Sequence, residues 1–187
     1  MCGIVGYIGK EQAAPILLEG LARLEYRGYD SAGICVAENG VLDVAKCKGR
    51  LKNLAAMTEN GALLHGTAGI GHTRWATHGE PNDINSHPHV SQNGKVALVH
   101  NGIIENYTEL KEKLLKHGYT FYSQTDTEVV IKLVDYYYKK YEHTPVDAIN
   151  HAMVRIRGSY ALALMFEEYP EEIYVARKDS PMIIGVA

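Results

Sequence analysis

The chain begins MCGIVGYIG (residues 1–9), with a cysteine directly after the initiator methionine and then an apolar run interrupted by glycines. Such a run predicts a buried strand that other groups approach closely at the glycines. Chain ends are usually frayed and polar, so a buried first strand is unusual. If Met1 is removed, Cys2 carries both a thiol and a free α-amine. We therefore expect a nucleophile at the start of the mature chain.

The composition is that of a globular protein, and it excludes several classes of function. The chain has 187 residues, of which 46% are hydrophobic and 22% charged, which suits one domain with a sizeable core. The formal net charge is -3 and no block of basic residues occurs, so we expect no nucleic-acid partner. The apolar runs are too short to cross a bilayer, so we expect no membrane partner either.

The cysteines and the first residues predict the compartment. Cys2, Cys35 and Cys47 are odd in number and lack C-x-x-C spacing, which argues against a disulfide framework and against a structural zinc site. No positive residue precedes the first apolar run, and Lys10 and Glu11 follow it almost at once, so it is not a secretory signal. We expect a cytoplasmic protein.

The pattern of helices and strands predicts an α+β fold. Apolar residues recur at helical spacing over residues 11–27, and Asn39-Gly40 is a strong hairpin signal between two strand-like runs. Strands in hairpins with helices in groups favour antiparallel sheets over a doubly wound parallel fold. The expected helices are 11–27 and 50–58, the expected strands are 31–37, 41–45, 68–74, 95–100, 159–166, 172–176 and 181–187, and a long loop is expected at 75–94.

Three further helices have recognisable starts. Asn106, Thr125 and Thr144 each precede a run of helical periodicity. Asn106 has a glutamate three residues later, as does Thr125 in the stretch TDTE (125–128), and this is the spacing of a capping box. Thr144 is followed by a proline, which is favoured at the first helical position. Because the chain stops on the apolar run 183–187, we expect it to be one domain of a longer polypeptide.

An N-terminal cysteine can perform acyl transfer without a histidine. The ordinary pKa of a thiol is about 8.5 and that of an α-amine about 7.7–8.0, so the amine can take the thiol proton near neutral pH. The reaction also needs an oxyanion hole. Asn101-Gly102 offers a side-chain amide donor and a glycine whose backbone N–H can come close. The plainer alternatives are that Cys2 is only a small residue after Met1 and that Asn101-Gly102 is a turn.

Two charged residues are candidates for holding a substrate. Arg74, in HTRWATHG (72–79), can bind a carboxylate through two parallel N–H groups. Asp126 lies in the first turn of its expected helix and can hold an ammonium group. Arg74 could instead belong to a structural ion pair, and Asp126 could simply be a carboxylate favoured by the helix dipole. Taken together with Cys2 and Asn101-Gly102, however, the two residues describe one site.

The histidines and glycines do not predict a cofactor. His87-Pro88-His89 lies in a histidine-rich stretch, but H-E-x-x-H is absent and no group of one carboxylate and two histidines has the i, i+4 spacing of a metal-binding helix. Gly69-Ile70-Gly71 lacks the third glycine of a dinucleotide-binding loop. We expect no metal and no other cofactor.

Five motifs, in this order along the chain, resemble those of the class II glutamine amidotransferases, which are N-terminal nucleophile hydrolases. They are MCGIVGYIG (1–9), LEYRGYDSAGI (24–34), GHTRWATHG (71–79), VHNGIIENY (99–107) and TDTEV (125–129). The resemblance covers essentially the whole chain. It implies a four-layer αββα sandwich of two antiparallel sheets, and hydrolysis of L-glutamine to glutamate and ammonia without a cofactor.

The resemblance also implies roles for the candidate catalytic residues. Cys2 would be the nucleophile and its α-amine the base. Asn101 and Gly102 would form the oxyanion hole. Arg27 would help to order the N-terminus, and Trp75 would gate the passage of ammonia toward a second domain.

The same resemblance assigns the substrate contacts. Arg74, with Thr77 and His78 near it, would bind the α-carboxylate of glutamine, and Asp126 would bind its α-ammonium group. The assignment agrees in charge, because burying a zwitterion without both partners is costly. The amide then lies at a fixed distance from this anchor, which would select glutamine over asparagine.

Within the family, residues 26–31 (YRGYDS) and 75–78 (WATH) resemble the branch that makes hexosamine phosphates. This implies that the whole chain, 1–187, is a glutaminase domain. A C-terminal sugar-phosphate isomerase domain would use the ammonia to convert fructose-6-phosphate to glucosamine-6-phosphate, in a homo-oligomeric enzyme. Two alternatives stay open: the glutaminase domain of an amidophosphoribosyltransferase, and a domain that binds glutamine without cleaving it.

Overall fold

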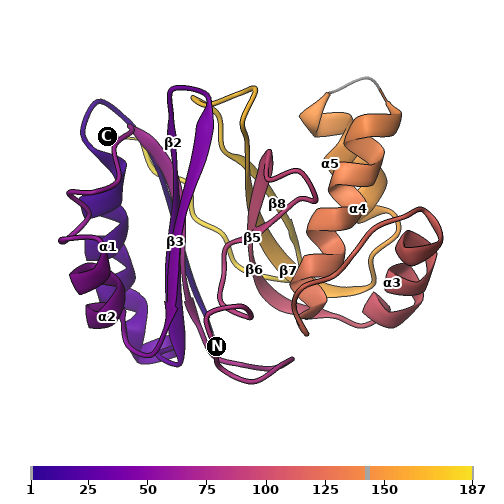
Figure 1. The fold of residues 1–187 in the computed structure, drawn as a ribbon, viewed down its shortest axis with the longest axis horizontal. Helices are drawn as coiled ribbons and strands as arrows, with labels where there is room; N and C mark the ends of the chain where they lie inside the picture. Colours follow the sequence, from indigo (N-terminus) through magenta and orange to yellow (C-terminus); the bar gives the residue numbers. More distant parts are fainter. Residues whose placement is uncertain (1, 142–143, 187) are drawn as a thin grey trace.

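The computed structural model describes residues 2–141 and 144–186. Two antiparallel sheets of four strands each pack face to face, and helices cover the outer face of each sheet (Figure 1). The predicted four-layer αββα sandwich is therefore confirmed. No helix among the described residues is long and apolar enough to cross a bilayer.

The first sheet has the strand order β1-β4-β2-β3. It consists of β1 (Gly3–Ile8), β4 (Ala68–Arg74), β2 (Ser31–Glu38) and β3 (Val41–Lys48). Each neighbouring pair is antiparallel. β4 is buried along its whole length because it lies between β1 and β2 and between two layers. The strand predicted for the first residues is confirmed, and it forms one edge of this sheet.

The hairpin between β2 and β3 follows the turn signal in the sequence. Asn39 and Gly40 both have positive φ angles, 50° and 76°, as a two-residue turn of type I′ requires. Both strands are longer than predicted, and their pairing extends to Ser31 opposite Lys48.

The second sheet has the strand order β5-β6-β7-β8. It consists of β5 (His89–Val90), β6 (Val96–Ile104), β7 (Gly158–Phe166) and β8 (Tyr174–Lys178). The short strand β5 lies inside the segment predicted to be a continuous loop, so that prediction was wrong there. β5 forms because residues 89–90 pair with the edge of β6, which local sequence does not indicate.

β6 continues through Asn101 and Gly102, which were predicted to follow the end of a strand. Asn101 pairs with Ala161 and Gly102 with Tyr160, and the pairing runs on to Ile104. The two residues therefore lie inside a strand and not in a turn after it. Local sequence was misleading here because Asn-Gly favours turns, whereas long-range pairing with β7 keeps the chain extended.

Helices α1 (Ala13–Leu24) and α2 (Leu51–Met57) pack on the outer face of the first sheet, and a short 3₁₀ turn, η1 (Glu25–Arg27), follows α1. The helix predicted at 11–27 thus ends in a tighter turn. The core between these helices and the sheet is built mainly from α1, β2 and α2 side chains: Ala13, Ala14, Leu17, Leu18, Leu21, Ala32, Ile34, Val36, Leu51 and Leu54.

Helices α3 (Tyr107–Lys116), α4 (Asp126–Lys140) and α5 (Pro145–Met153) cover the second sheet (Figure 1). α4 is buried along most of its length because it lies between the sheet and the other two helices. Its apolar residues, such as Val130 and Val134, form a large core with the outward face of β6 and β7.

A third core joins the two sheets and contains several small residues. Alanines from both sheets, among them Ala37, Ala97 and Ala163, pack with Ile70 and Met165. Small side chains let the two sheets approach closely. The first strand β1 is consequently held near β6 of the other sheet, and this proximity builds the site described below.

The predicted capping box at the start of α4 is half confirmed. The Thr125 hydroxyl accepts a hydrogen bond from the Glu128 backbone N–H at 3.3 Å. The Glu128 carboxylate does not return the bond. It accepts instead from the backbone N–H groups of Tyr122 (3.0 Å) and Ser123 (2.7 Å), which tie the preceding loop to the helix.

The other two helix starts were placed correctly, but their side chains do not cap. Asn106 precedes α3, yet its amide donates to the Arg155 carbonyl at 2.9 Å and accepts from the Arg157 N–H at 2.8 Å. Thr144 precedes α5, and its hydroxyl bonds to the Asp147 carboxylate. A tertiary partner therefore replaced the capping bond at Asn106, and a side chain in the first turn of the helix replaced it at Thr144.

The last predicted strand, 181–187, was wrong over its described residues. Residues 181–186 form no strand, and Ala187 lies outside the described part of the chain. Asp179 has a φ of 53°, so the chain turns away from the sheet directly after β8. Residues 181–185 line a cavity beside β1 instead.

Candidate active site

A cavity of about 860 Å³ lies between β1 of one sheet and β6–β8 of the other. Its wall contains all of the residues singled out in the sequence: Cys2, Arg27, Arg74, Trp75, Thr77, His78, Asn101, Gly102 and Asp126. These residues come from five separate segments of the chain. The fold therefore brings together the complete predicted site.

Cys2 directly precedes β1 and faces the end of β4. Its Sγ accepts a hydrogen bond from the Trp75 backbone N–H at 3.2 Å and lies 3.5 Å from the Trp75 carbonyl. Burial raises the pKa of the thiol, and the Trp75 backbone contact only partly offsets this effect. The thiol is therefore protonated near neutral pH, and its activation needs a base.

The glycine after Cys2 is required by close packing. A Cβ at Gly3 would lie 2.7 Å from the Leu24 Cβ and 2.8 Å from the Thr73 Oγ1. Any side chain here would push β1 away from α1 and β4. The position of the thiol thus depends on this glycine.

Asn101 and Gly102 face Cys2 from the opposite sheet. The Asn101 Nδ2 donates to the Cys2 carbonyl at 3.1 Å, and its Oδ1 lies 3.0 Å from the His72 Nε2. Gly102 has a φ of 122°, and a Cβ there would lie 2.1 Å from the Ser159 carbonyl oxygen. Both an amide donor and a glycine backbone are therefore placed beside the thiol.

Arg74 is the last residue of β4, and only 3% of it is exposed. Its guanidinium donates to the carbonyls of His78, Gly79 (3.1 Å) and Glu80 (3.4 Å). Burial lowers the pKa of Arg74, and the nearby carboxylates of Asp30 and Asp126 oppose this effect. The arginine therefore holds the loop after β4 in addition to lining the cavity.

Asp126 is the first residue of α4 and is almost completely buried. One carboxylate oxygen accepts from the Ile104 N–H at 2.9 Å, and the other lies 3.9 Å from the His78 Nδ1. The same ring nitrogen lies 3.2 Å from the Thr77 Oγ1. The cavity wall thus carries a buried cation, Arg74, and a buried anion, Asp126.

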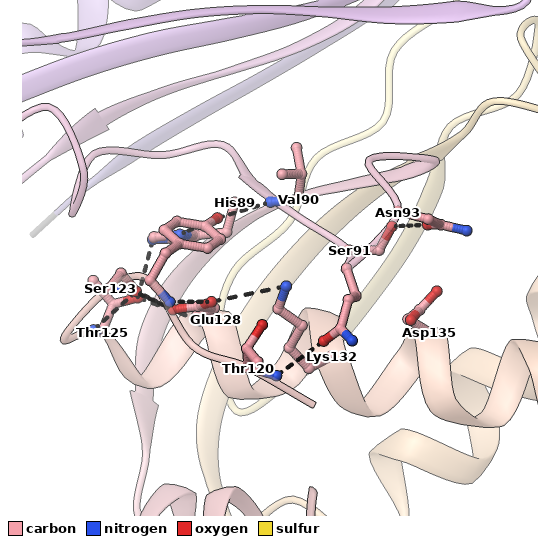
Figure 2. Close-up of polar contacts among 12 residues, drawn as sticks. His89, Val90, Ser91, Asn93, Thr120, Ser123, Thr125, Glu128, Lys132 and Asp135 are labelled. Carbon is pink, nitrogen blue, oxygen red and sulfur yellow. Dashed lines mark hydrogen bonds and ion pairs between the residues drawn. The ribbon is translucent and has the colours of Figure 1, made fainter. Parts of the chain in front are cut away.

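The start of α4 is fixed by a second polar network (Figure 2). Ser123 and Thr125 lie next to the Glu128 carboxylate, and Lys132 lies on the following turn of the helix with its Nζ 3.9 Å from Glu128. Thr125 also bonds to the His89 Nε2 at 3.0 Å. This network holds the helix end that presents Asp126 to the cavity.

Trp75 contacts Cys2 through its backbone, whereas its indole is half exposed. The indole packs edge-on against the Tyr29 ring, with the ring centroids 5.6 Å apart. Arg27 reaches the same cavity from η1. Both residues therefore line the cavity that contains the thiol, and their predicted roles in gating ammonia and ordering the N-terminus stay predictions.

Comparison with known proteins identifies the family. A family model described as the glutamine amidotransferase domain matches residues 72–184, more than half of the chain. The chain belongs to the glutamine amidotransferase family.

Relatives support the same family over the full length of this amidotransferase domain. It is 58% identical to the glutamine–fructose-6-phosphate aminotransferase [isomerizing] of Caldanaerobacter subterraneus subsp. tengcongensis and 55% identical to that of Clostridium tetani. All of the chain aligns in both cases, but it spans only 30% of each relative.

Solved structures confirm the fold of the amidotransferase domain. The glutamine phosphoribosylpyrophosphate amidotransferase from B. subtilis, complexed with ADP and GMP, superposes with a TM-score of 0.79 at 32% identity. The match covers 95% of this chain and 37% of that one. The predicted sandwich of two antiparallel sheets is thus shared with a known amidotransferase.

One functional residue of the amidotransferase domain was missed in the sequence. Asp30 accepts a hydrogen bond from the Ala76 backbone N–H and another from the Ser31 hydroxyl at 3.0 Å. It therefore holds the segment that carries Trp75. The signal was present, since Asp30 lies inside the motif YRGYDS at 26–31, but the sequence alone did not indicate what this aspartate contacts.

The buried histidines of the domain are the second omission. His72, His87, His89 and His100 are buried, and His87 and His100 form part of the cavity wall. Burial lowers the pKa of each ring, that of His72 to about 3. They are therefore neutral. Among the described residues no group of three or more His, Cys, Asp or Glu side chains is arranged to hold a metal ion.

Proposed function

We propose that this domain hydrolyses L-glutamine to glutamate and ammonia, with Cys2 as the nucleophile. The observation that carries the proposal is the cavity itself. It places the thiol, an amide donor and a glycine backbone at one point, and a buried cation and anion nearby. This arrangement matches the requirements of amide cleavage in a zwitterionic substrate.

The base is the α-amine of Cys2 after removal of Met1. The thiol is protonated near neutral pH because burial raises its pKa, so it must give up a proton to attack. The amine takes this proton while Sγ bonds to the side-chain carbonyl carbon of glutamine. The C–N bond then breaks, and the leaving nitrogen takes the proton and departs as ammonia.

Water completes the reaction. It adds to the thioester on Cys2, the C–S bond breaks, and glutamate leaves as the thiol regains a proton. The Asn101 Nδ2 and the Gly102 N–H would stabilise the oxyanion of both tetrahedral intermediates. Loss of one such donor typically costs about 3–4 kcal/mol of transition-state stabilisation.

The buried charges would hold the amino-acid end of glutamine. A guanidinium carries five N–H donors, and the loop carbonyls accept from two of the Arg74 nitrogens. The α-carboxylate would bind the remaining N–H groups, with Thr77 and His78 beside it. The α-ammonium group would bind the Asp126 carboxylate.

We further propose that the domain belongs to an enzyme that aminates fructose-6-phosphate to glucosamine-6-phosphate, through a sugar-phosphate isomerase domain. This rests on 58% identity to a relative of that name and on the 30% of it that the chain spans. In that enzyme, a homo-oligomer, Trp75 would gate the ammonia and Arg27 would order the N-terminus. The amidophosphoribosyltransferase alternative is less favoured, because identity to such a chain is 32%.

The cysteines support a cytoplasmic location for this enzyme. All three are free thiols in the structure, as expected in a reducing compartment. This location stays a prediction.

The decisive experiment compares glutamate release by the wild type, by Cys2→Ala and by Cys47→Ala as a cysteine control, with Met1 removal verified by intact mass. We expect no release from Cys2→Ala, although calorimetry still detects glutamine binding, and normal release from Cys47→Ala. Wild-type rates from Cys2→Ala, or full activity from protein that retains Met1, would overturn the mechanism. Glutamine binding without hydrolysis by the wild type would favour the non-catalytic alternative.

A further inference from the structure

His72 lies in β4, directly behind Asn101, and is completely buried. Its Nε2 is 3.0 Å from the His100 carbonyl oxygen and 3.0 Å from the Asn101 Oδ1. The proposed roles of the cavity residues do not involve this histidine. Its contacts nevertheless determine how the proposed oxyanion donor is oriented.

The tautomer of His72 follows from these two contacts. A backbone carbonyl can only accept a hydrogen bond, so the Nε2 beside the His100 carbonyl must carry the proton. The ring is neutral because burial lowers its pKa to about 3, and it therefore holds only this one proton. Accordingly, the buried His72 Nδ1 has no hydrogen-bond partner among the described residues, and an N–H group there would be left unsatisfied.

The tautomer in turn fixes the Asn101 amide. A protonated Nε2 requires an acceptor opposite it, so the Asn101 oxygen must face His72 and the Asn101 nitrogen must face Cys2. The structure shows this orientation, with Nδ2 3.1 Å from the Cys2 carbonyl. A flipped amide would set an N–H group against the His72 N–H and present an oxygen to the developing oxyanion.

The histidine ring is itself held in place. It stacks on His87, with ring centroids 4.0 Å apart and an angle of 13° between the planes. The His87 Nδ1 accepts from the His100 backbone N–H at 3.2 Å. The two stacked rings therefore bind both backbone polar groups of His100, which is the residue before Asn101.

We propose that His72 is a positioning residue that keeps the Asn101 amide N–H directed at the oxyanion site, an inference that rests on the proposed function. His72 contacts neither the thiol nor the cavity space in this role. Its effect passes through Asn101 alone.

The test measures kcat and KM for glutamine hydrolysis in His72→Leu and His72→Gln. Leucine removes the donor, and we expect kcat to fall about 10- to 100-fold while KM stays within about threefold of the wild-type value. This fall in kcat is smaller than the one expected when an oxyanion donor is removed altogether. Glutamine can place an N–H near the Nε2 position, and we expect it to restore kcat to within about fivefold. Ile70→Ala serves as the packing control, because it lies two residues earlier on the same face of β4 and is fully buried in the core between the sheets. It should lower stability but not kcat.

A double-mutant cycle with Asn101→Ala separates positioning from a direct role. If His72 acts only through Asn101, His72→Leu will change kcat by less than about twofold in the Asn101→Ala background. Full additivity of the two effects would overturn the proposal, as would a loss confined to KM.

The tautomer can be measured in the unmodified protein even where a variant fails to fold. Nitrogen-15 NMR of the His72 ring should show a protonated Nε2 and a bare Nδ1, and the opposite tautomer would refute the proposal. The outcomes are distinguishable, because absence of glutaminase activity in the wild type would reject the proposed function and leave the ring tautomer measurable.

Discussion

Replacing Asn101 with alanine should separate catalysis from folding. The change removes two hydrogen bonds, the one from Nδ2 to the Cys2 carbonyl (3.1 Å) and the one accepted from the His72 Nε2 (3.0 Å). The His72 N–H keeps its second acceptor, the His100 carbonyl, so no buried donor is left unpaired. The fold should therefore survive the substitution.

The magnitudes follow from this geometry. Two hydrogen bonds at about 0.5–1.5 kcal/mol each give a loss of about 1–3 kcal/mol in unfolding free energy. For a chain of this length that lowers Tm by roughly 3 °C per kcal/mol. The same substitution removes an oxyanion donor, so kcat should fall about 10²- to 10³-fold, or about 2.7–4 kcal/mol.

The assay is glutamate release at saturating glutamine, combined with thermal unfolding of the same preparations. Asn106→Ala is the matched control, because that asparagine also makes two hydrogen bonds to backbone groups, at Arg155 and Arg157, but lies outside the cavity wall. It should lose similar stability and keep its activity. A kcat for Asn101→Ala within about fivefold of the wild type, in folded protein, would refute the assignment of the oxyanion donor.

Three further outcomes follow from the buried groups. Gly102→Ala should lower the unfolding free energy in urea by about 2–6 kcal/mol, because its φ is 122° and its Cβ would lie 2.1 Å from the Ser159 oxygen. Glu128→Gln should cost up to about 3 kcal/mol in the same assay, since it removes one of the two buried carboxylates, Glu128 and Asp135, that stabilise the buried Lys132 charge. Acidification should also destabilise the protein: the pKa of His72 is about 3 in the fold against about 6.5 when unfolded, so the unfolded chain alone binds this proton between those values. This proton uptake lowers the unfolding free energy by about 1.4 kcal/mol at pH 5.5, and the loss disappears above pH 6.5.

One of these outcomes has a matched control variant, and each of the other two has a result that would contradict it. Glu109→Gln removes an exposed i, i+4 partner of Lys113 and should change stability by less than about 0.5 kcal/mol, so an equal effect at Glu128 would contradict the argument from burial. Unchanged urea midpoints in Gly102→Ala would show that the strand relaxes around the new methyl group. A flat unfolding free energy between pH 7.5 and pH 5.5 would show that the histidines are not held neutral.

Local signals in the sequence placed most elements but not their partners. The Asn39-Gly40 turn was predictable because two positive φ angles suit those residues. Asn101-Gly102 carries the same signal, yet it lies inside a strand because pairing with β7 extends through it. The run at 181–187 is apolar, yet residues 181–186 join no strand. At Asn101-Gly102 a long-range partner strand overrode the local preference for a turn. At residues 181–186 no strand forms, although the local sequence favours one.

The sequence by itself determined which chemical groups the site contains: a thiol at the start of the chain, an Asn-Gly pair, an arginine and an aspartate in the first turn of a helix. Only the tertiary structure decided how they meet. The small residues between the sheets bring β1 next to β6, so Cys2 comes to lie against the Trp75 backbone and the Asn101 amide. The orientation of that amide depends on His72 and on the carbonyl of His100, because a hydrogen-bond direction is set by the groups that surround it in space and not by neighbours along the chain.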